Sequence, residues 1–263
     1  MNILILGNCT ENFSNYIKES KHFNKLFLTA NSTEVNIPSF VFTDEKDLAH
    51  KIKGLQIDVV IISDKNYIQN GMVEYLRSQY INVISPNKKW FNLESSRLIA
   101  KQLLNHYSIN IPQTIRAPKN FPLVIRTDRP IKDKIVKSMD ELVFVMENFS
   151  GENFFLEEYL EGECYEQFSL WDGKSACHFI NKDSLSEVQI DRLDLLQTKF
   201  NFMLSDEKAD FIGFFSTKLI WAKNDWHVLD FSMSFNEDLA LEYIKSDFLY
   251  ILDSAIYQKL NEL

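Results

Sequence analysis

Glycine is scarce in this sequence: the 263 residues include 7 glycines, and none lies between Gly71 and Gly151. An average chain of this length would carry roughly 18, at a usage of about 7%. Glycine lets backbone amides approach a phosphate group closely, so phosphate-binding loops are usually rich in it. The shortage therefore argues against a glycine-rich phosphate-binding loop in the middle of the chain.

Other shortages narrow the class of protein. Cys9, Cys164 and Cys177 are the only cysteines, and their wide spacing favours reduced thiols over a disulfide framework or a zinc site. The apolar runs, such as Val59–Ile62, are far shorter than the roughly 20 residues of a membrane helix. No basic stretch offsets the formal net charge of -9, which opposes binding to nucleic acid or acidic membranes. Because Met1 leads directly into a strand-like run rather than an export signal, we expect a cytoplasmic protein.

What the sequence does contain is enough apolar material for a core, since 45% of its residues are hydrophobic. The first 110 residues alternate β-rich runs with helical patterns. Strands are expected at Asn2–Leu6, Lys25–Thr29, Ser39–Phe42, Asp58–Ile62 and Asn82–Ile84, and helices after Thr10, after Asp44, through Met72–Leu76 and from Asn87 to about Tyr107. This alternation predicts a parallel sheet covered on both faces. Asn110-Ile111-Pro112 breaks the last helix, so we place a boundary near residue 110.

The second half of the chain has a different pattern. Strands are expected at Leu123–Arg126, Lys134–Val136, Phe154–Glu157, Glu163–Trp171, Phe211–Trp221 and Trp226–Phe231, and helices at Ser138–Asn148, Ser184–Leu204 and about Glu237–Leu260. The last two strands look antiparallel, and Lys223-Asn224-Asp225 suits the turn of a hairpin between them.

A series of segments then occurs in the order found in one known family. They are Met1–Asn8, Asp58–Ile62, Gly71–Ser78, Ile81–Pro86, Leu93–Lys101, Pro122–Asp128, Lys137–Glu141, Leu156–Glu163 and Val228–Ser232. Together they resemble phosphoribosylamine-glycine ligase, also called glycinamide ribonucleotide synthetase, an ATP-grasp enzyme. The resemblance implies an α/β chain: a Rossmann-like pre-ATP-grasp domain over residues 1–110, a small lobe over 111–172 and a shortened core lobe over 173–263. It also implies a cleft between Leu123–Val136 and Trp226–Phe231.

The resemblance further implies an ATP site, of which two parts are retained in altered form. Arg97 and Arg126 stand where the family has lysine, so positive charge persists and is able to pair with phosphate oxygens. The segment Glu157-Glu158-Tyr159-Leu160 would offer a backbone edge to adenine, and Glu163 would accept hydrogen bonds from ribose hydroxyls. The alternative is that this segment merely joins the two lobes, with its glutamates in solvent.

The other parts of the implied site are weakened. The glycine-rich phosphate loop corresponds to Arg129–Lys134, which has no glycine, and a substrate loop corresponds to Ser63–Ile68, which keeps nothing of the family pattern. At the expected magnesium site Asp230 replaces a glutamate and Ser232 an asparagine, a poorer ligand set. The first phosphate-binding turn keeps Gly7-Asn8 but adds Cys9-Thr10-Glu11, which favours an ordinary strand-to-helix turn. No catalytic residue is identifiable.

Three functions stay open from the sequence. The first is a catalytically impaired relative that binds a nucleotide or a protein partner of unknown kind, and the glycine-free loop favours it. The second is an active ATP-dependent carboxylate-amine ligase with another acceptor, in which Arg97 and Arg126 clamp phosphate, and the retained charge favours it. The third is a structural or assembly role. ATP with Mg²⁺ is the expected cofactor if nucleotide binding survives; otherwise there is none. The five histidines, His178 among them, share no metal-ligand or catalytic spacing and are expected to be surface or packing residues.

Overall fold

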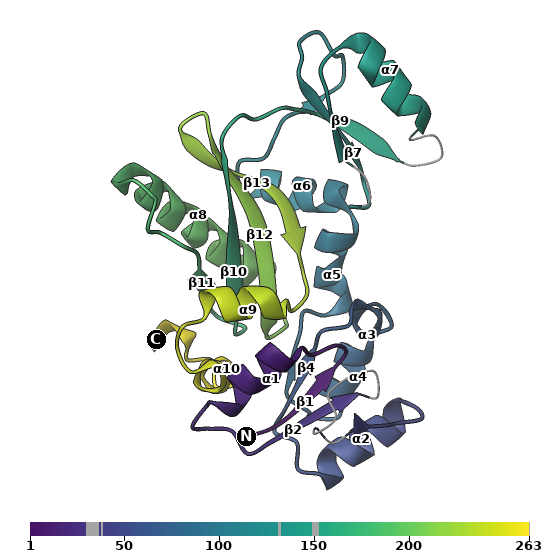
Figure 1. Cartoon of the computed structure of the whole chain (residues 1–263), viewed down its shortest axis with the longest axis vertical. Helices are drawn as coiled ribbons and strands as arrows, with labels where there is room; N and C mark the ends of the chain where they lie inside the picture. The colour runs from purple at the N-terminus through teal and green to yellow at the C-terminus, as the bar shows by residue number, and fades with distance from the viewer. Residues whose placement is uncertain (30–36, 38, 131–132, 149–152, 263) are drawn as a thin grey trace.

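The computed structural model describes residues 1–29, 37, 39–130, 133–148 and 153–262. Within them, the short apolar runs of the N-terminal third form a parallel sheet in the order β3-β2-β1-β4-β5, at the bottom of Figure 1. Its strands are β1 (Asn2–Leu6), β2 (Lys25–Thr29), β3 (Ser39–Phe40), β4 (Val59–Ile62) and β5 (Val83–Ile84). The connecting helices are α1 (Glu11–Lys18), α2 (Glu45–Gly54), α3 (Lys65–Gln69) and α4 (Met72–Ser78). The parallel α/β unit predicted at the N-terminus is confirmed.

The helix expected from Asn87 to about Tyr107 is in fact two helices, α5 (Lys88–Ser95) and α6 (Arg97–His106). They meet at Ser96, whose backbone is extended and whose hydroxyl accepts a hydrogen bond from the N–H of Ile99 at 3.3 Å. A serine side chain that bonds a nearby N–H ends one helix and begins the next, although the apolar spacing continues through the break. The break places Arg97 at the start of a new helix.

A second sheet, in the order β6-β9-β7-β8, is antiparallel and lies at the top of Figure 1. It consists of β6 (Thr114–Ile115), β7 (Leu123–Thr127), β8 (Asp133–Val136) and β9 (Phe154–Glu158), and α7 (Met139–Asn148) packs on it. We call this part the small lobe. Its own core is small, because its buried hydrophobic cluster contains only Leu123, Ile125, Val136, Leu142 and Val145 among the described residues.

The third sheet, the central sheet, has the order β11-β10-β12-β13. Its strands are β10 (Glu163–Trp171), β11 (Ala176–Phe179), β12 (Gly213–Ala222) and β13 (Asp225–Ser232). Lys223 and Asn224 connect β12 to β13 with φ of 54° and 61°, the backbone of a two-residue hairpin turn, so the predicted hairpin is confirmed. The resemblance places residues 111–172 in the small lobe, but β10 pairs with β12 along its whole length. This strand therefore belongs to the central sheet, and the change of sheet lies near residue 160.

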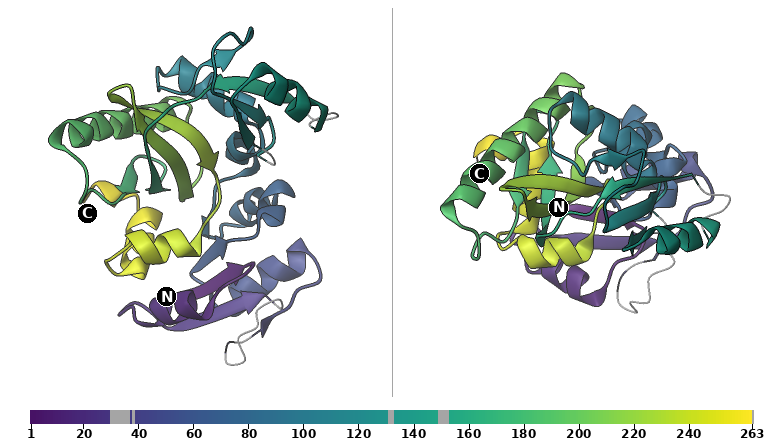
Figure 2. Two further views of the ribbon diagram at one scale, coloured as in Figure 1. Left: turned by 45° about the horizontal axis from the view of Figure 1, so that its top comes forward. Right: turned by 90° about the horizontal axis from the view of Figure 1, so that it is seen from above.

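Helices cover both faces of the central sheet (Figure 2). The helices are α8 (Glu187–Asp206), α9 (Glu237–Tyr243) and α10 (Phe248–Ile256), followed by the short 3-10 helix η1 (Leu260–Glu262). The single helix expected at about Glu237–Leu260 is thus divided, because Asp247 caps a new N-terminus by accepting from the backbone of Leu249 and Tyr250. No helix in the described part of the chain is long and apolar enough to cross a membrane.

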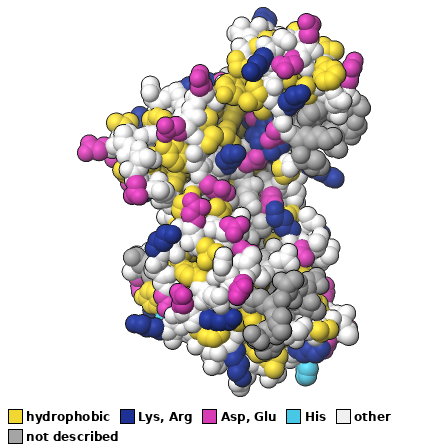
Figure 3. Space-filling model, in the orientation of Figure 1, with side chains coloured by type: hydrophobic (Ala, Val, Ile, Leu, Met, Phe, Trp, Pro, Cys, Tyr) yellow, Lys and Arg dark blue, Asp and Glu magenta, His cyan; other side chains and the backbone are white. Residues whose placement is uncertain are grey.

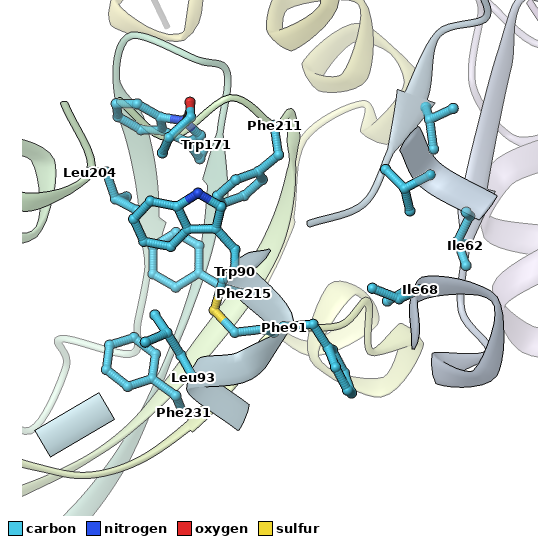
Figure 4. Close-up of a cluster of buried hydrophobic side chains, with 14 of the residues drawn as sticks. Ile62, Ile68, Trp90, Phe91, Leu93, Trp171, Leu204, Phe211, Phe215 and Phe231 are labelled. Atoms are coloured by element: carbon cyan, nitrogen blue, oxygen red, sulfur yellow. Dashed lines mark hydrogen bonds between the residues drawn. The ribbon is translucent and has the colours of Figure 1, made fainter. Parts of the chain in front are cut away.

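One hydrophobic core joins the N-terminal sheet to the central sheet. In Figure 4, Trp90 of α5 points toward Phe211, with ring centroids 5.7 Å apart, while its neighbour Phe91 lies on the side of Ile68. Adjacent residues of one helix thus bury large rings on two sides, and aromatic side chains bury more area than any others. The small lobe contributes no comparable part of this core, so its attachment to the rest of the chain depends more on its contacts across the cleft.

Candidate functional site

A cavity of about 360 Å³ lies between the small lobe and the central sheet, within the size range of small-molecule sites. The expected cleft is therefore present. Its lining is partly apolar, with Val124, Ile135, Leu160, Ile220 and Leu229, and partly charged, with Arg126, Asp133, Glu157, Glu158, Lys218 and Asp230. In Figure 3, basic and acidic side chains lie next to each other between these two parts of the molecule, beside an apolar stretch of surface. The charged part decides what chemistry the cleft can perform.

Arg97, in the first turn of α6, binds two of these charged lining residues. Its guanidinium binds Asp230 through two hydrogen bonds, Nε to Oδ1 at 3.0 Å and Nη2 to Oδ2 at 2.8 Å. It binds Asp133 in the same way, Nη1 to Oδ1 at 2.7 Å and Nη2 to Oδ2 at 3.0 Å. Nη1 also donates to the carbonyl oxygen of Thr127 at 3.0 Å. A guanidinium has five N–H groups. In Arg97 all five donate to oxygens of this chain.

Arg126, on β7, shares the same acceptors. Its Nη2 donates to Asp230 at 2.6 Å and to Asp133 at 3.3 Å, and its Nη1 donates to the carbonyl oxygen of Leu229 at 2.7 Å and to Glu157 at 3.3 Å. Burial alone would lower the pKa of Arg126, but the attraction of Asp230, Glu157 and Asp133 outweighs it, so the pKa is raised above its ordinary value. This side chain stays charged and held in place.

Lys101 completes the group, one helical turn after Arg97 on α6. Its ammonium donates to the carbonyl oxygen of Pro112 at 2.7 Å and forms an ion pair with the buried carboxylate of Glu157. Three cations, Arg97, Lys101 and Arg126, therefore face three anions, Asp133, Glu157 and Asp230. We call these six residues the cleft ion cluster. Its formal charge at neutral pH is zero, because each positive charge has a negative partner.

The residues expected to hold magnesium do not fit that ion. Both carboxylate oxygens of Asp230 already accept from guanidinium groups. The hydroxyl of Ser232 donates to Glu94 at 3.3 Å and lies 3.2 Å from the hydroxyl of Ser234. Magnesium needs available oxygen ligands in near-octahedral geometry. Among the described residues there is no group of three or more His, Cys, Asp and Glu side chains placed to hold a metal ion.

The residues expected to bind adenosine lie in different surroundings, and not all of them line the cavity. Glu158 accepts from the N–H of Gln113 at 3.1 Å and pairs with Lys223 at the hairpin turn. Burial would raise the pKa of Glu158, but these two contacts outweigh it and the pKa is lowered. Tyr159 and Leu160 line the cavity, and their backbone N–H and C=O groups have no hydrogen-bond partner in the described part of the chain. Glu163 instead accepts from the hydroxyl of Tyr165 at 2.7 Å and does not line the cavity.

Two loops in which the family's phosphate-binding pattern is weakened, Arg129–Lys134 and the turn after β1, make contacts within this chain where the structure describes them. In the segment Arg129–Lys134, Ile131 and Lys132 lie outside the described residues, and Asp133 begins β8 directly opposite Arg126. At the first strand-to-helix turn Gly7 has φ of 128°, and a Cβ there would lie 2.4 Å from the hydroxyl oxygen of Ser63. The N–H of Thr10 in this turn donates to the Glu237 carboxylate at 2.9 Å. A carboxylate of the chain therefore takes a backbone N–H in this turn too.

The structure thus gathers Arg97, Arg126, Glu157 and Asp230 in one cluster and leaves Glu163 and Ser232 outside it. Sequence reasoning did not include Lys101, although its position four residues after Arg97 on a helix places both side chains on one face. Asp133 is present in the sequence analysis only as part of the glycine-free segment Arg129–Lys134. Its place between two arginines depends on the register of β7 and β8, which no local pattern specifies.

Comparison with known proteins gives the fold. No family model matches the chain. Phosphoribosylamine-glycine ligase from Fusobacterium nucleatum is 20% identical to it over 79% of this chain and 61% of the relative. The solved structure of the Thermotoga maritima phosphoribosylamine-glycine ligase has a TM-score of 0.70 at 17% identity and covers 90% of this chain and 70% of that chain. D-alanine-D-alanine ligase from Bacillus anthracis, solved in complex with ATP, has a TM-score of 0.64 at 16% identity and covers 100% and 98%.

These likenesses confirm the predicted resemblance to phosphoribosylamine-glycine ligase and the predicted fold, an N-terminal parallel α/β domain followed by two ATP-grasp lobes. The chain spans about 61% of the length of the Fusobacterium relative that it matches.

Proposed function

We propose that this chain is a catalytically impaired ATP-grasp protein whose cleft binds a nucleoside-type ligand and does not promote ligation. The observation that carries the proposal is the complete use of the Arg97 guanidinium by Asp133, Asp230 and Thr127. Ligation through an acyl phosphate needs cationic groups that are free to neutralise the transferred phosphoryl group. Here Arg97, Lys101 and Arg126 already neutralise carboxylates of the same chain.

Freeing these cations is costly. The Arg97 and Arg126 side chains are each 8% exposed, so removing one partner leaves a buried charge without compensation. Breaking a buried ion pair in this way typically destabilises a protein by about 3–5 kcal/mol. A triphosphate would have to offset that cost in addition to its own desolvation. The phosphate part of a nucleotide should therefore add little to binding.

The rest of the cavity retains what a nucleoside needs. Val124, Ile135 and Ile220 offer apolar contacts to a flat base, and the unbonded backbone groups of Tyr159 and Leu160 can read its edge. The Bacillus anthracis ligase with the same fold was solved with ATP. We carry only the nucleoside part of that ligand over to this chain, because the cleft ion cluster opposes the phosphate part.

Calorimetric titration with adenosine and with ATP, with and without Mg²⁺, tests the binding half of the proposal. We expect ATP to bind less than about a hundredfold more tightly than adenosine, a difference of about 2.7 kcal/mol. The catalytic half is tested by following ADP release with glycine and phosphoribosylamine, and we expect no substrate-dependent release. Substrate-dependent ADP production that disappears in Asp230→Ala would refute the proposal.

One observation favours the second candidate, an active carboxylate-amine ligase with another acceptor. The Asp133 side chain is 40% exposed, so it is the most easily displaced anion of the cleft ion cluster. If it moved away, Arg97 and Arg126 would each regain N–H donors for a phosphate group. The same ADP assay, run with a panel of small amines and carboxylic acids, distinguishes this candidate from the first.

A further inference from the structure

The three anions of the cleft ion cluster differ in how firmly they are held. The Glu157 side chain is 3% exposed and Asp230 27%, whereas Asp133 is 40% exposed. Glu157 and Asp230 come from β9 and β13, which pair along their lengths with neighbouring strands. Asp133 is the first residue of β8, the edge strand of the small lobe, and it borders the cavity. It is therefore the anion of the cluster that is most exposed to an incoming ligand.

The contacts of Asp133 are those that an oxyanion of a phosphate group would make. Its two oxygens accept from Nη1 and Nη2 of Arg97 at 2.7 and 3.0 Å, and Oδ2 also accepts from Nη2 of Arg126 at 3.3 Å. Paired, parallel hydrogen bonds from a guanidinium suit a carboxylate and a phosphate equally. A phosphoryl group at this place would compete for the same donors and would meet the negative charge of Asp133.

The two guanidinium groups do not depend on Asp133 for their positions. Arg97 is also held by both oxygens of Asp230 and by the carbonyl of Thr127. Arg126 is also held by the carbonyl of Leu229, by Glu157 and by Asp230. Without Asp133 the cluster would keep its geometry and carry one surplus positive charge. Such preorganised, partly desolvated cations make a ready anion site.

We propose that Asp133 is a built-in substitute for a phosphate group, and that this single residue excludes phosphorylated ligands from a cleft that accepts uncharged nucleosides. Asp133 is then a specificity-determining residue for ligand binding. The inference about nucleosides rests on the proposed function. The inference about phosphate rests only on the contacts of Asp133, so the two can fail separately.

Removing the carboxylate tests the proposal, because phosphate binding should appear where it was absent. We compare the full chain with Asp133→Ala and Asp133→Asn, using tripolyphosphate, ATP and adenosine as ligands in calorimetry without metal at low ionic strength. Asp133→Ala should bind tripolyphosphate and ATP about 10- to 100-fold more tightly than the unmodified chain, in line with the strength of charged hydrogen bonds. Asp133→Asn should gain less, because its amide oxygen still occupies a donor. Adenosine affinity should change less than threefold.

The matched control is Asp194→Ala on α8, which removes the same charge from an exposed ion pair with Lys182, outside the cavity. It should gain no phosphate affinity. Adding Arg97→Gln to Asp133→Ala should abolish the gain, because the binding guanidinium is lost. Thermal unfolding checks that each variant is folded, and Asp133→Asn serves if the alanine variant is not.

Several outcomes would overturn the proposal: tripolyphosphate affinity equal in the unmodified chain and in both Asp133 variants, an equal gain in Asp194→Ala, or a gain that persists without Arg97. If the unmodified chain does not bind adenosine but Asp133→Ala gains tripolyphosphate, the proposed nucleoside function fails while the role of Asp133 against phosphate stands. The opposite result, adenosine binding without a gain, rejects the role of Asp133 alone.

Discussion

Arg97 and Arg126 retain the positive charge that a phosphate clamp needs, and in the folded chain that charge is met by Asp133, Glu157 and Asp230. The sequence identified both arginines and Asp230 as site residues, and the structure brings them within hydrogen-bonding distance of one another. Both guanidinium groups are held by carboxylates of this chain, and the partners of a side chain define its role as much as its type does. Charge retained at a position is therefore a weak indicator of retained function when acidic side chains can reach it.

A second residue-scale feature lies in the central sheet. The ring of His178 is half-buried, with Nδ1 2.8 Å from the hydroxyl of Ser169 and Nε2 3.4 Å from the amide nitrogen of Asn201. Burial, helped by the positive charge of Lys182, lowers the pKa of His178 to about 4. The sequence expectation of a packing residue agrees with this position, and the lowered pKa makes stability depend on pH.

We predict that the chain loses stability as the pH falls from 7 to 5. The unfolded chain binds a proton at His178 below a pKa of about 6.5, whereas the folded chain does not until about 4. The unfolded state thus binds more protons in this window, and the free energy of unfolding falls by about 2 kcal/mol at pH 5 from this group. Urea unfolding at both pH values measures it. His178→Gln, which cannot titrate, should show a clearly smaller loss; an equal loss in both proteins would contradict the prediction.

At the scale of elements, the break between α5 and α6 positions the first arginine of the cluster. The hydroxyl of Ser96 donates to Asp128 at 2.8 Å and accepts from Ile99, and the N–H of Arg97 donates to the carbonyl oxygen of Asp128 at 3.0 Å. These contacts fasten the start of α6 to the end of β7. A continuous helix would direct Arg97 elsewhere, so one capping serine links secondary structure to the chemistry of the cleft.

Ser96→Ala tests this link. The free energy of unfolding should fall by about 1 kcal/mol, the usual effect of losing an N-cap side chain, as measured by urea unfolding. Ser186→Ala removes the N-cap of α8, which lies outside the cavity, and should cause a similar loss. Only Ser96→Ala should also weaken the tripolyphosphate binding expected of Asp133→Ala, because Arg97 is no longer fixed. If Ser96→Ala and Ser186→Ala, each combined with Asp133→Ala, both leave the tripolyphosphate affinity unchanged, Ser96 has no positioning role.

At the scale of the whole molecule, the three sheets are not joined equally. The N-terminal and central sheets share one hydrophobic core, whereas the described core of the small lobe has five buried residues of its own. The small lobe meets the central sheet through the cleft ion cluster, the Glu158 to Lys223 pair and a small apolar contact of Leu160 with Ile220 and Ala222. Much of this attachment is therefore polar.

We predict that the small lobe opens more readily than the rest of the chain. In hydrogen exchange followed by mass spectrometry, peptides of β7 and β9 should exchange faster than those of β1 and β4, because few buried contacts protect them. Asp230→Ala should accelerate exchange in β7 and β9 at least tenfold, since it removes a carboxylate that both arginines share, and should leave β1 and β4 unchanged. Equal protection of the two regions, or uniform acceleration, would show that the lobes open together.

Features of this chain that depend on local interactions could be predicted from its sequence, and those that depend on distant contacts could not. The parallel N-terminal unit, the hairpin at Lys223 and Asn224 and the positions of most strands follow from local periodicity and turn chemistry, and the sequence determined them. The helix break at Ser96 was not predicted, because the apolar spacing continues across it. A tertiary contact between Ser96 and Asp128 decides that the helix breaks there.

The cleft ion cluster was decided by the tertiary structure alone. Asp133 faces Arg126 through the register of two paired strands, and Asp230 reaches Arg126 across 104 residues of sequence. Which charges meet depends on how distant strands pack, and no local pattern encodes that. The ordered family segments in the sequence therefore predicted the ATP-grasp fold, which the solved structures confirm. Only the folded arrangement decided that carboxylates of this chain neutralise Arg97 and Arg126, because buried arginines require partners that packing alone can supply.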